Sequence, residues 1–507
     1  MLGDARRNIA VGGALDALEQ RLDGPVARAV THLLAPWHGR AKPAPPSTRR
    51  VPVPPDAAAS APEVAAWVEE ALRSGALETA AQAAMRLTAA PEELSRATPA
   101  ALARVIEALL MGGQHDRARE LSRAHMPRLA ATTAGQSSLE LLDLGASDWL
   151  PDGTPHWLRL SRRIAAGALS AEDLARIVVD KLLVCLKAPD VHLLFFSAIV
   201  QRDGAAATRF LSRYLAAYGS PACELRPGKT SNVLRSLTFA APPTPRWTGK
   251  SVSVLVATRN SAATIEYAIE SLLAQSYGKL EILVGDDASD DETLPVLQDR
   301  FGHEPRVRLF RSSRQQGSYN LRNALARRAL GEYVTFHDAD DLALPDRIAR
   351  QVAQLARPGV MACVGNFARV TADGRFVFFK DQKATRLCPV SLMLERRTFG
   401  AIGPFRSAKV GADLELYAAL CARFGPRGVS RLRAPLMFGL SAPGSATRSS
   451  GSEALQDGYR SPARRAYSEL VFAQGHSPRR SLPASEMDER LRATGNFIDS
   501  AELLEVG

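Results

Sequence analysis

The chain has 507 residues, of which 46% are hydrophobic and 23% are charged, and its formal net charge is +11 at pH 7. This length exceeds one ordinary core and this composition is that of a globular protein, so general disorder is excluded and several domains are expected. The positive charge favours an anionic partner, but there is no zinc-binding spacing, RNA-recognition signature or long Lys/Arg block, which argues against nucleic acid.

The cysteines and the N-terminus indicate a cellular compartment. The first residues, MLGDARRNIAVGG, lack the apolar core of a secretion signal. The most apolar stretch, VHLLFFSAIV at 191–200, has about half the length needed to cross a bilayer. Five scattered cysteines suit free thiols in a reducing environment: Cys185, Cys223, Cys363, Cys388 and Cys421. We therefore expect a cytoplasmic protein with at most a peripheral contact with the anionic inner membrane.

The first half of the chain is predicted to be helical. Residues 1–35 show one helical pattern, and the Pro-, Ala- and Arg-dense residues 36–62 read as a semi-extended linker. Residues 63–240 are rich in Ala, Leu and Arg with helical periodicity, which predicts an all-α domain. Within it, residues 75–87 and 113–125 faintly resemble paired-helix repeats, although a plain helical bundle fits equally well. No catalytic constellation occurs there, so we expect this domain to contact a protein partner.

The character of the sequence changes after a break at 241–250. Short apolar runs then alternate with helical patterns, which is typical of βαβ units and a mainly parallel sheet. This pattern predicts an α/β domain over residues 248–445 and a helical tail over residues 446–507. The expected strands are Val252–Ala257, Glu281–Gly285, Val307–Phe310 and Glu332–Phe336, with a helix at Ser318–Ala329.

Ligands of open α/β sheets bind at the carboxyl ends of the strands, and three polar clusters occur at such ends here. The first cluster is Ala257-Thr258-Arg259-Asn260. Its turn offers backbone N–H groups and small side chains to a nucleotide, although a simple turn also explains the pattern.

The second cluster is G-D-D-A-S-D-D-E-T at 285–293. Ser289 and Glu292 have the spacing of a capping box, which predicts that they start the next helix. Asp286 and Asp287 are then expected to be exposed and to have no capping duty. Their carboxylates can accept hydrogen bonds from a base or from ribose hydroxyls, and two solvated turn carboxylates are the plain alternative.

The third cluster is F-H-D-A-D-D at 336–341. Asp338 and Asp340 follow a strand at i and i+2, a spacing that suits a hard divalent cation bridging to substrate phosphates. Solvated acids also explain this pattern, and His337 either supports such a site or is only its neighbour.

A fourth signal is G-A-D-L-E-L-Y at 411–417. The apolar residues of this segment lie on one helical face, which places Asp413 at the start of a helix. Taken alone, that position is explained by the helix dipole, which favours an acid in the first turn.

Taken in order, these clusters resemble the family 2 glycosyltransferases, which have the GT-A fold. The series is A-T-R-N, G-D-D-A-S-D-D-E-T, G-S-Y-N-L-R-N-A-L-A, G-E-Y-V-T-F-H-D-A-D-D and G-A-D-L-E-L-Y, and it covers roughly residues 250–440. The resemblance implies an α/β GT-A domain with a mainly parallel, mixed sheet, preceded here by an all-α N-terminal domain. It also implies a bacterial enzyme of polysaccharide or glycolipid biosynthesis that inverts the anomeric configuration.

The resemblance implies roles for the matching positions. Asp338 and Asp340 would form the motif for Mn²⁺ or Mg²⁺, with Asp340 as the direct ligand. Asp413 would be the general base that takes the proton of the acceptor hydroxyl, with Glu415 as a second candidate. The residues expected to contact the donor are Ala257, Thr258, Arg259, Asp286, Asp287, Arg322, Asn323 and Asp338.

The donor is expected to be a nucleotide-diphosphate sugar, with uridine diphosphate as its usual carrier, and the acceptor a saccharide or a lipid-linked saccharide.

Ala257 and Arg259 replace the usual Pro and Tyr of the family, and Ala412 precedes Asp413 where Glu is common. These departures leave open a non-catalytic scaffold that binds nucleotide sugar. A nucleotidyltransferase would need a Gly-rich loop after the first strand, which this sequence does not have. There is also no Q-x-x-R-W motif, so a processive synthase is not expected.

Overall fold

The computed structural model describes residues 63–132, 189–441, 467 and 484–506. Short gaps inside these ranges fall at 65, 69–70, 72–76, 90, 112–113, 202, 227–231, 241–248, 378–382 and 494–495. The helical segment predicted at 1–35 and the linker at 36–62 lie outside the described residues, as does most of the tail predicted from residue 446. In the part of the chain that is described, no helix is long and apolar enough to span a bilayer.

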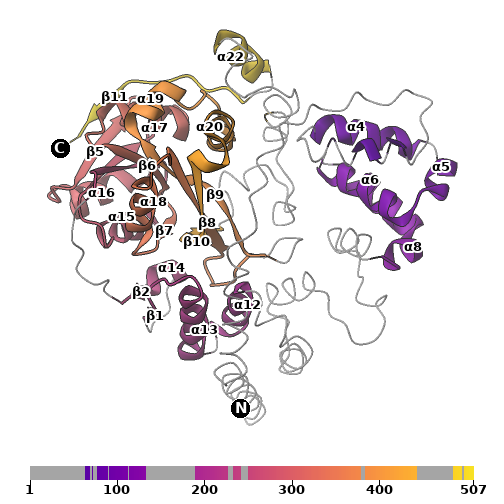
Figure 1. Cartoon of the computed structure of the whole chain (residues 1–507), viewed down its shortest axis with the longest axis horizontal. Coiled ribbons are helices and arrows are strands. Elements are labelled where there is room, and N and C mark those ends of the chain that lie inside the picture. The colour runs from indigo at the N-terminus through magenta and orange to yellow at the C-terminus, as the bar shows by residue number, and fades with distance from the viewer. Residues whose placement is uncertain are drawn as a thin grey trace.

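The first described region is helical and has a core of its own (Figure 1). Its apolar faces meet around Leu102, Ile106 and Leu109, all of which are fully buried. This agrees with the predicted all-α region, while paired-helix repeats stay a prediction. The helices are α4 (Leu77–Thr88), α5 (Pro91–Arg96), α6 (Pro99–Met111), α7 (His115–Ala124) and α8 (Met126–Ala130).

The second half of the chain folds around a nine-stranded mixed sheet, with the strand order β11-β5-β4-β3-β6-β9-β8-β10-β7. Its central strands β5, β4, β3 and β6 are parallel, and β9, β7 and β11 pair antiparallel with their neighbours. The strands are β3 (Val252–Thr258), β4 (Leu280–Asp286), β5 (Val307–Ser312), β6 (Tyr333–Asp338), β7 (Asp341–Ala343), β8 (Ala362–Val370), β9 (Thr385–Glu395), β10 (Val429–Leu440) and β11 (Leu503–Glu505).

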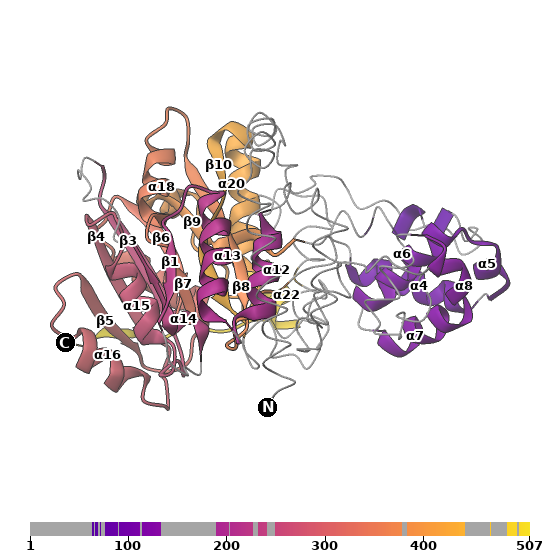
Figure 2. The ribbon, with the colours of Figure 1, turned by 90° about the horizontal axis from the view of Figure 1, so that it is seen from below.

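The four predicted strands are confirmed as β3, β4, β5 and β6, and most of their apolar side chains are covered on both faces of the sheet. Along β3, Val254 and Val256 face one core and Leu255 faces the other. The helices on the Val254 side are α15 (Ile265–Leu273), α16 (Thr293–Phe301) and α18 (Arg347–Leu355). Those on the Leu255 side are α17 (Gly317–Arg328), α19 (Arg396–Ile402) and α20 (Ala412–Gly428). The result is an α/β/α domain, shown edge-on in Figure 2.

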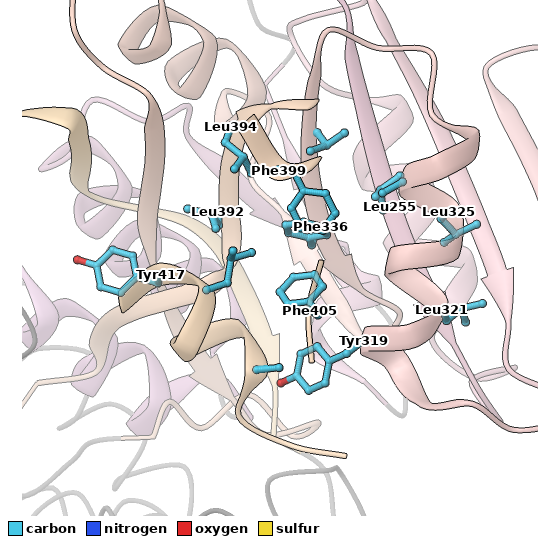
Figure 3. Close-up of a cluster of buried hydrophobic side chains, with 14 of the residues drawn as sticks. Leu255, Tyr319, Leu321, Leu325, Phe336, Leu392, Leu394, Phe399, Phe405 and Tyr417 are labelled. Carbon is cyan, nitrogen blue, oxygen red and sulfur yellow. The ribbon is translucent and has the colours of Figure 1, made fainter. Parts of the chain in front are cut away.

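The core on the Leu255 side is built largely from aromatic rings that approach each other closely. Phe405 lies between Phe336 and Tyr319, with ring centroids 4.8 Å and 5.3 Å apart, respectively (Figure 3). Phe399 adds a third ring at 5.7 Å from Phe336. Because Tyr319 comes from α17 and Phe405 from the segment between α19 and α20, this core fixes α17 against the approach to α20.

Residues 190–239 were grouped with the helical domain by their periodicity, yet they share a core with the sheet. Phe210, Tyr214 and Leu234 pack with Phe376 and Phe438, which belong to the sheet region. The boundary predicted at residue 240 therefore does not separate two cores, and Figures 1 and 2 show these helices against the β7–β10–β8 end of the sheet. The elements are α12 (Asp190–Ile199), α13 (Gly204–Ala216), β1 (Cys223–Leu225), α14 (Val233–Ser236) and β2 (Leu237–Phe239).

The end of the chain also joins the α/β domain. After helix α22 (Ala484–Ala493), residues 496–502 run along the domain, and β11 then pairs antiparallel with the edge strand β5. The segment predicted as a helical tail thus contains a strand of the main sheet.

Candidate active site

The register of the parallel strands brings the first three polar clusters to one edge of the sheet. Thr258 at the end of β3 lies opposite Asp286 at the end of β4, and Asp286 lies opposite Arg311 on β5. On the other side of β3, Ala257 lies opposite Asp338 at the end of β6. The hydroxyl oxygen of Thr258 is buried and has no hydrogen-bond partner within the described residues. Such an orphaned polar atom at the carboxyl edge suits contact with a ligand.

The loops that follow β3 and β4 are joined into one unit. The amide of Asn260 donates to Oγ of Ser289 (3.0 Å), and the amide of Asp290 donates to Oδ1 of Asn260 (3.1 Å). Asn260 and Ala288 have positive φ angles of 48° and 55°, which are uncommon for residues other than glycine. Strained backbone of this kind persists where the surrounding contacts hold it, and it clusters at functional sites.

Asp286 and Asp287 are buried, which corrects the expectation that they are exposed and have no capping duty. The carboxylate of Asp286 accepts from the amide (3.1 Å) and the hydroxyl of Ser289, and Nε of Arg311 lies 3.8 Å from its Oδ2. Asp287 accepts from the amides of Gln316 (2.7 Å) and Gly317 (2.9 Å), so it caps the start of α17. Burial raises the pKa of Asp287, although these two amides act in the opposite direction. Both acids therefore shape the loops as well as border the site.

The capping box predicted for Ser289 and Glu292 is wrong. Glu292 precedes α16 without a side-chain capping bond, and the Ser289 hydroxyl is turned toward Asp286. Asp291 takes over the capping role, because it accepts from the amide and hydroxyl of Thr293 and from the amide of Ala262.

Asp338 and Asp340, two of the three acids of the third cluster, lie in different surroundings. Asp338 is partly exposed, and its Oδ1 accepts from Nη2 of the buried Arg322. Burial and the neighbouring carboxylate of Asp338 raise the pKa of Asp340 to about 6, while the charge of Arg369 opposes this shift. The Nε of Arg322 is buried and has no hydrogen-bond partner within the described part of the chain. The site therefore combines two neighbouring carboxylates with a buried guanidinium.

His337 is a structural neighbour of the acids and is fully buried. Nη1 of Arg347 donates to its Nδ1 (2.8 Å), and its Nε2 lies 3.2 Å from the carbonyl oxygen of Asp341. Burial and the Arg347 charge lower the pKa of His337 well below its ordinary value, so the ring is neutral. Both ring nitrogens are thus occupied by protein groups, and the ring has no free nitrogen for a metal.

Asp413 lies in the first turn of α20, as predicted. The hydroxyl of Tyr319 donates to its Oδ1 at 2.8 Å, and the same hydroxyl accepts from the amide of Gly411 at 3.1 Å. Glu415 is fully buried and is held by Arg406 (3.3 Å) and by the hydroxyl of Tyr467. A buried carboxylate that already accepts two hydrogen bonds is poorly placed to meet an acceptor substrate. Between the two candidate bases, this geometry favours Asp413 over Glu415.

The remaining donor-site candidates lie in different surroundings. Ala257 is partly buried and Arg259 is exposed, close enough to Asp287 for its charge to lower the pKa of that acid. Asn323 is buried and holds the backbone of Phe405 through two hydrogen bonds. Its Nδ2 donates to the carbonyl oxygen of Phe405 (2.8 Å), and its Oδ1 accepts from the backbone amide of Phe405 (2.9 Å). These contacts of Asn323 are with the protein, and its contact with the sugar-nucleotide donor stays a prediction.

Two residues of the site were not singled out from the sequence. Arg311 was missed because nothing local marks a cation at the end of β5, and its relation to Asp286 arises only from strand pairing. Tyr319 stands three residues before Arg322 within the G-S-Y-N-L-R-N series, so helical spacing already puts both on one face of α17.

Asp338 and Asp340 fit a divalent ion in their chemistry. Both supply the oxygen ligands that Mg²⁺ and Mn²⁺ take. Burial raises the pKa of Asp340 first and repulsion from Asp338 adds to it, and a cation would relieve that repulsion. Among the described residues, no group of three or more Asp, Glu, His or Cys side chains gathers into a complete metal site. An ion held by two carboxylates must take its other ligands from water and substrate phosphates, which is the usual arrangement for Mg²⁺ in phosphate-handling sites.

Comparison with known proteins identifies the domain. Residues 253–408 match the family model described as Glycosyl transferase family 2. The chain therefore contains a glycosyl transferase family 2 domain, and its mixed, mainly parallel sheet agrees with the GT-A fold expected from the sequence. The helical residues 63–132 lie outside this match.

The most similar relatives include bacterial proteins of polysaccharide synthesis. Succinoglycan biosynthesis protein ExoO of Rhizobium meliloti (strain 1021) is 38% identical over 142 residues, which are 28% of this chain and 40% of that protein. UDP-Glc:alpha-D-GlcNAc-diphosphoundecaprenol beta-1,3-glucosyltransferase WfgD of Escherichia coli is 28% identical over 130 residues, 25% of this chain and 50% of that protein. The chain thus spans 40% to 50% of the length of these two relatives.

Among solved structures, the mannosyltransferase PcManGT from Pyrobaculum calidifontis in complex with GDP-Man and Mn²⁺ is 25% identical, with a TM-score of 0.33. That similarity covers 50% of this chain and 70% of the other.

Proposed function

We propose that the family 2 domain transfers a sugar, with inversion, from a nucleotide-diphosphate sugar to a hydroxyl group of a polysaccharide or glycolipid acceptor, with the help of a divalent metal. Asp413 is the proposed general base, and Asp338 and Asp340 are the proposed metal ligands. Thr258, Asp286 and their neighbours on the same sheet edge form the proposed donor site.

One observation carries this proposal. Tyr319 and Arg322 stand one turn apart on α17, where Tyr319 bonds Asp413 and Arg322 bonds Asp338. Side chains three residues apart on a helix are neighbours, so the proposed base and the proposed metal motif border the same small space. A donor diphosphate at Asp338 would therefore present its sugar toward Asp413.

The donor would lie along the carboxyl edge of the sheet. Thr258, whose hydroxyl has no hydrogen-bond partner among the residues that the structure describes, and the acid Asp286 would contact the nucleoside, with Arg311 and Arg259 as flanking cations. Because Asp287 holds the start of α17, its proposed role is to shape this pocket as well as to contact base or ribose. A bound metal ion would neutralise the diphosphate as it leaves. Asp340 and, in part, Asp338 would hold this ion.

The transfer itself is a single displacement. The acceptor hydroxyl gives its proton to Asp413 while its oxygen attacks the anomeric carbon, and the bond from that carbon to the diphosphate oxygen breaks. The Tyr319 hydroxyl leaves the other carboxylate oxygen of Asp413 available for the proton, since it occupies only Oδ1. Attack from the face opposite the leaving group inverts the configuration.

The relatives suggest the substrate class. WfgD is named for a UDP-glucose donor and a diphosphoundecaprenol-linked acceptor, and ExoO for succinoglycan biosynthesis. By this analogy we propose a uridine diphosphate sugar as donor and a lipid-linked saccharide as acceptor. The sugar transfer would then take place in the cytoplasm or at the surface of the inner membrane. The N-terminal helical region would contact a protein partner.

Calorimetry with UDP, GDP, CDP, dTDP and ADP, with and without Mn²⁺, tests the donor site. We expect one nucleotide to bind the wild type only with Mn²⁺ and to lose at least tenfold in affinity in Asp340→Ala. The exposed Asp290→Ala is the matched control and should bind as the wild type does. Binding of no nucleotide by the folded protein would contradict the donor site. Nucleotide binding without sugar transfer, across a broad set of donors and acceptors, would favour the non-catalytic scaffold.

A further inference from the structure

The segment that leads into Asp413 is held by three asparagines from outside it. Asn323 bonds the backbone of Phe405 through both its amide atoms. The Oδ1 of Asn320 accepts from the hydroxyl of Ser407 at 3.0 Å. Asn496 bonds Lys409 and Val410, and the chain then passes through Gly411 into α20.

Asn496 makes the most extensive of these contacts and is fully buried. Its Oδ1 accepts from the amides of Lys409 (3.1 Å) and Val410 (3.1 Å), and its Nδ2 donates to the carbonyl of Val410 at 3.2 Å. Its own carbonyl accepts from the amide of Lys409 at 2.8 Å. A buried side-chain amide with both ends bonded to one stretch of backbone fixes that backbone, because any shift leaves buried polar groups unpaired.

Asn496 begins a stretch, residues 496–502, that we call the C-terminal strap. The amide of Ile498 donates to the carbonyl of Ser407 (3.0 Å), and the carbonyl of Ile498 accepts from Nδ2 of Asn320 (2.8 Å). Further along, the amide of Ala501 donates to Oε1 of Gln316 (3.1 Å). The strap therefore touches the approach to Asp413 at one end and the start of α17 at the other, before β11 anchors it to the sheet.

The start of α17 is also the donor side of the site, because Asp287 caps it and Tyr319 reaches from it to Asp413. One stretch of backbone thus connects the two parts that must be in register for transfer. Misplacing a reacting group by about 1 Å can lower a rate on the order of 10²-fold.

We propose that Asn496 is a positioning residue for the transfer reaction and that the C-terminal strap belongs to the catalytic unit, although it lies outside residues 253–408. This inference rests on the proposed function for its catalytic consequence. Asn496 acts through Lys409 and Val410 on Asp413 and does not itself meet the substrate.

The test compares Asn496→Ala and Asn496→Asp with Glu505→Gln in the full chain. Glu505 is on β11, where its exposed carboxylate pairs with Arg308, so its loss perturbs the same end of the chain away from the site. Turnover is divided by the number of Mn²⁺–nucleotide sites counted by calorimetry, which corrects for misfolded protein. We expect Asn496→Ala to lose at least tenfold in kcat per site with nucleotide affinity within threefold of the wild type. Asn496→Asp keeps acceptors for the two amides and should regain part of kcat, and Glu505→Gln should stay within twofold.

Amide hydrogen exchange supplies a readout that does not need turnover. The amide of Val410, which loses its side-chain acceptor, should exchange at least tenfold faster in Asn496→Ala than in Glu505→Gln, with the amides of β3 and β4 unchanged. The amide of Lys409 keeps its bond to the backbone carbonyl of residue 496 and should change less. Unchanged exchange at Val410, or a kcat per site equal to that of Glu505→Gln, would overturn the proposal. So would an equal loss of nucleotide affinity and kcat, since it would mean general destabilisation. A wild type that transfers no sugar would contradict the proposed function instead, and the exchange result would then decide the role of the strap.

Discussion

Tyr319 donates its phenolic hydrogen bond to Oδ1 of Asp413 across 2.8 Å, and so connects a helix at the donor side of the sheet to the proposed base. The same hydroxyl accepts from the amide of Gly411, so it fixes the first turn of α20 as well as the carboxylate. A group held in this way has one orientation available when an acceptor arrives.

Tyr319→Phe should lower kcat by about 10- to 100-fold, the effect of losing a hydrogen bond to a charged group worth about 1.5–3 kcal/mol. The KM for the donor should change less than threefold, because the ring still packs against Phe405. Steady-state kinetics with varied donor measures both constants. Tyr417→Phe, which removes a hydroxyl further along α20, is the control, and equal kinetics for the two variants would contradict the positioning role.

Asp413→Asn should mainly lower kcat, whereas Glu415→Gln should mainly lower the stability of the protein. Loss of the base should reduce kcat by about 10²- to 10⁴-fold with the free energy of unfolding nearly unchanged. Loss of the Glu415 charge leaves Arg406 and the buried Tyr467 hydroxyl poorly matched, which should cost about 2–3 kcal/mol of stability. Urea titrations and kinetics on both variants test this, and a larger fall in kcat for Glu415→Gln at full folding would reverse the assignment.

Asp287→Asn should destabilise the protein by about 1–3 kcal/mol, because an amide offers one acceptor oxygen where two backbone N–H groups now bond. The side-chain NH₂ group of the new asparagine would face the N–H group of Gln316 or Gly317, and that N–H group would lose its acceptor. Chemical denaturation at neutral pH gives the free energy of unfolding. Asp290→Asn, on the exposed side of the same loop, should be neutral, and a neutral Asp287→Asn would show that the cap contributes little.

His192 should make stability fall in mild acid. Burial and the charge of Arg213 lower its pKa from 6.5 to about 4, so the unfolded chain binds a proton at a pH where the folded protein does not. The contribution is therefore full above pH 6.5 and is lost as the pH falls toward 4, by roughly 3 kcal/mol in total. Urea titrations from pH 7.5 to 4 should show a steeper decline for the wild type than for His192→Gln, and parallel curves would refute it.

The strands were predictable because of their composition. The runs at 252–257 and 281–285 are apolar apart from Ser253 and Glu281, as expected of strands covered on both faces, and the acids that follow them were placed correctly at the sheet edge. The later strands β8, β9 and β10 gave no comparable signal, since polar residues such as Arg369 and Arg386 interrupt them.

The errors concern contacts between distant segments. Asp287 looked solvated because its partners, Gln316 and Gly317, come about 30 residues later. Helix α13 has the same periodicity whether it packs in a bundle or on a sheet, so its position beside Phe438 could not be predicted from the sequence. Asn496 is one polar residue in a polar tail, and only the folded chain shows that it holds Val410.

The shared core of α12, α13 and the sheet has a consequence for how the chain is made. Tyr214 packs beside Phe438, with ring centroids 6.4 Å apart, yet the two are separated by about 220 positions in the sequence. At 5–20 residues per second, a ribosome needs roughly 11–45 s to reach the second after the first. During that interval α13 can pack on α12 but lacks its partners on the sheet, so the yield of the protein in a cell should depend on how well nascent chains are shielded and on the pace of translation.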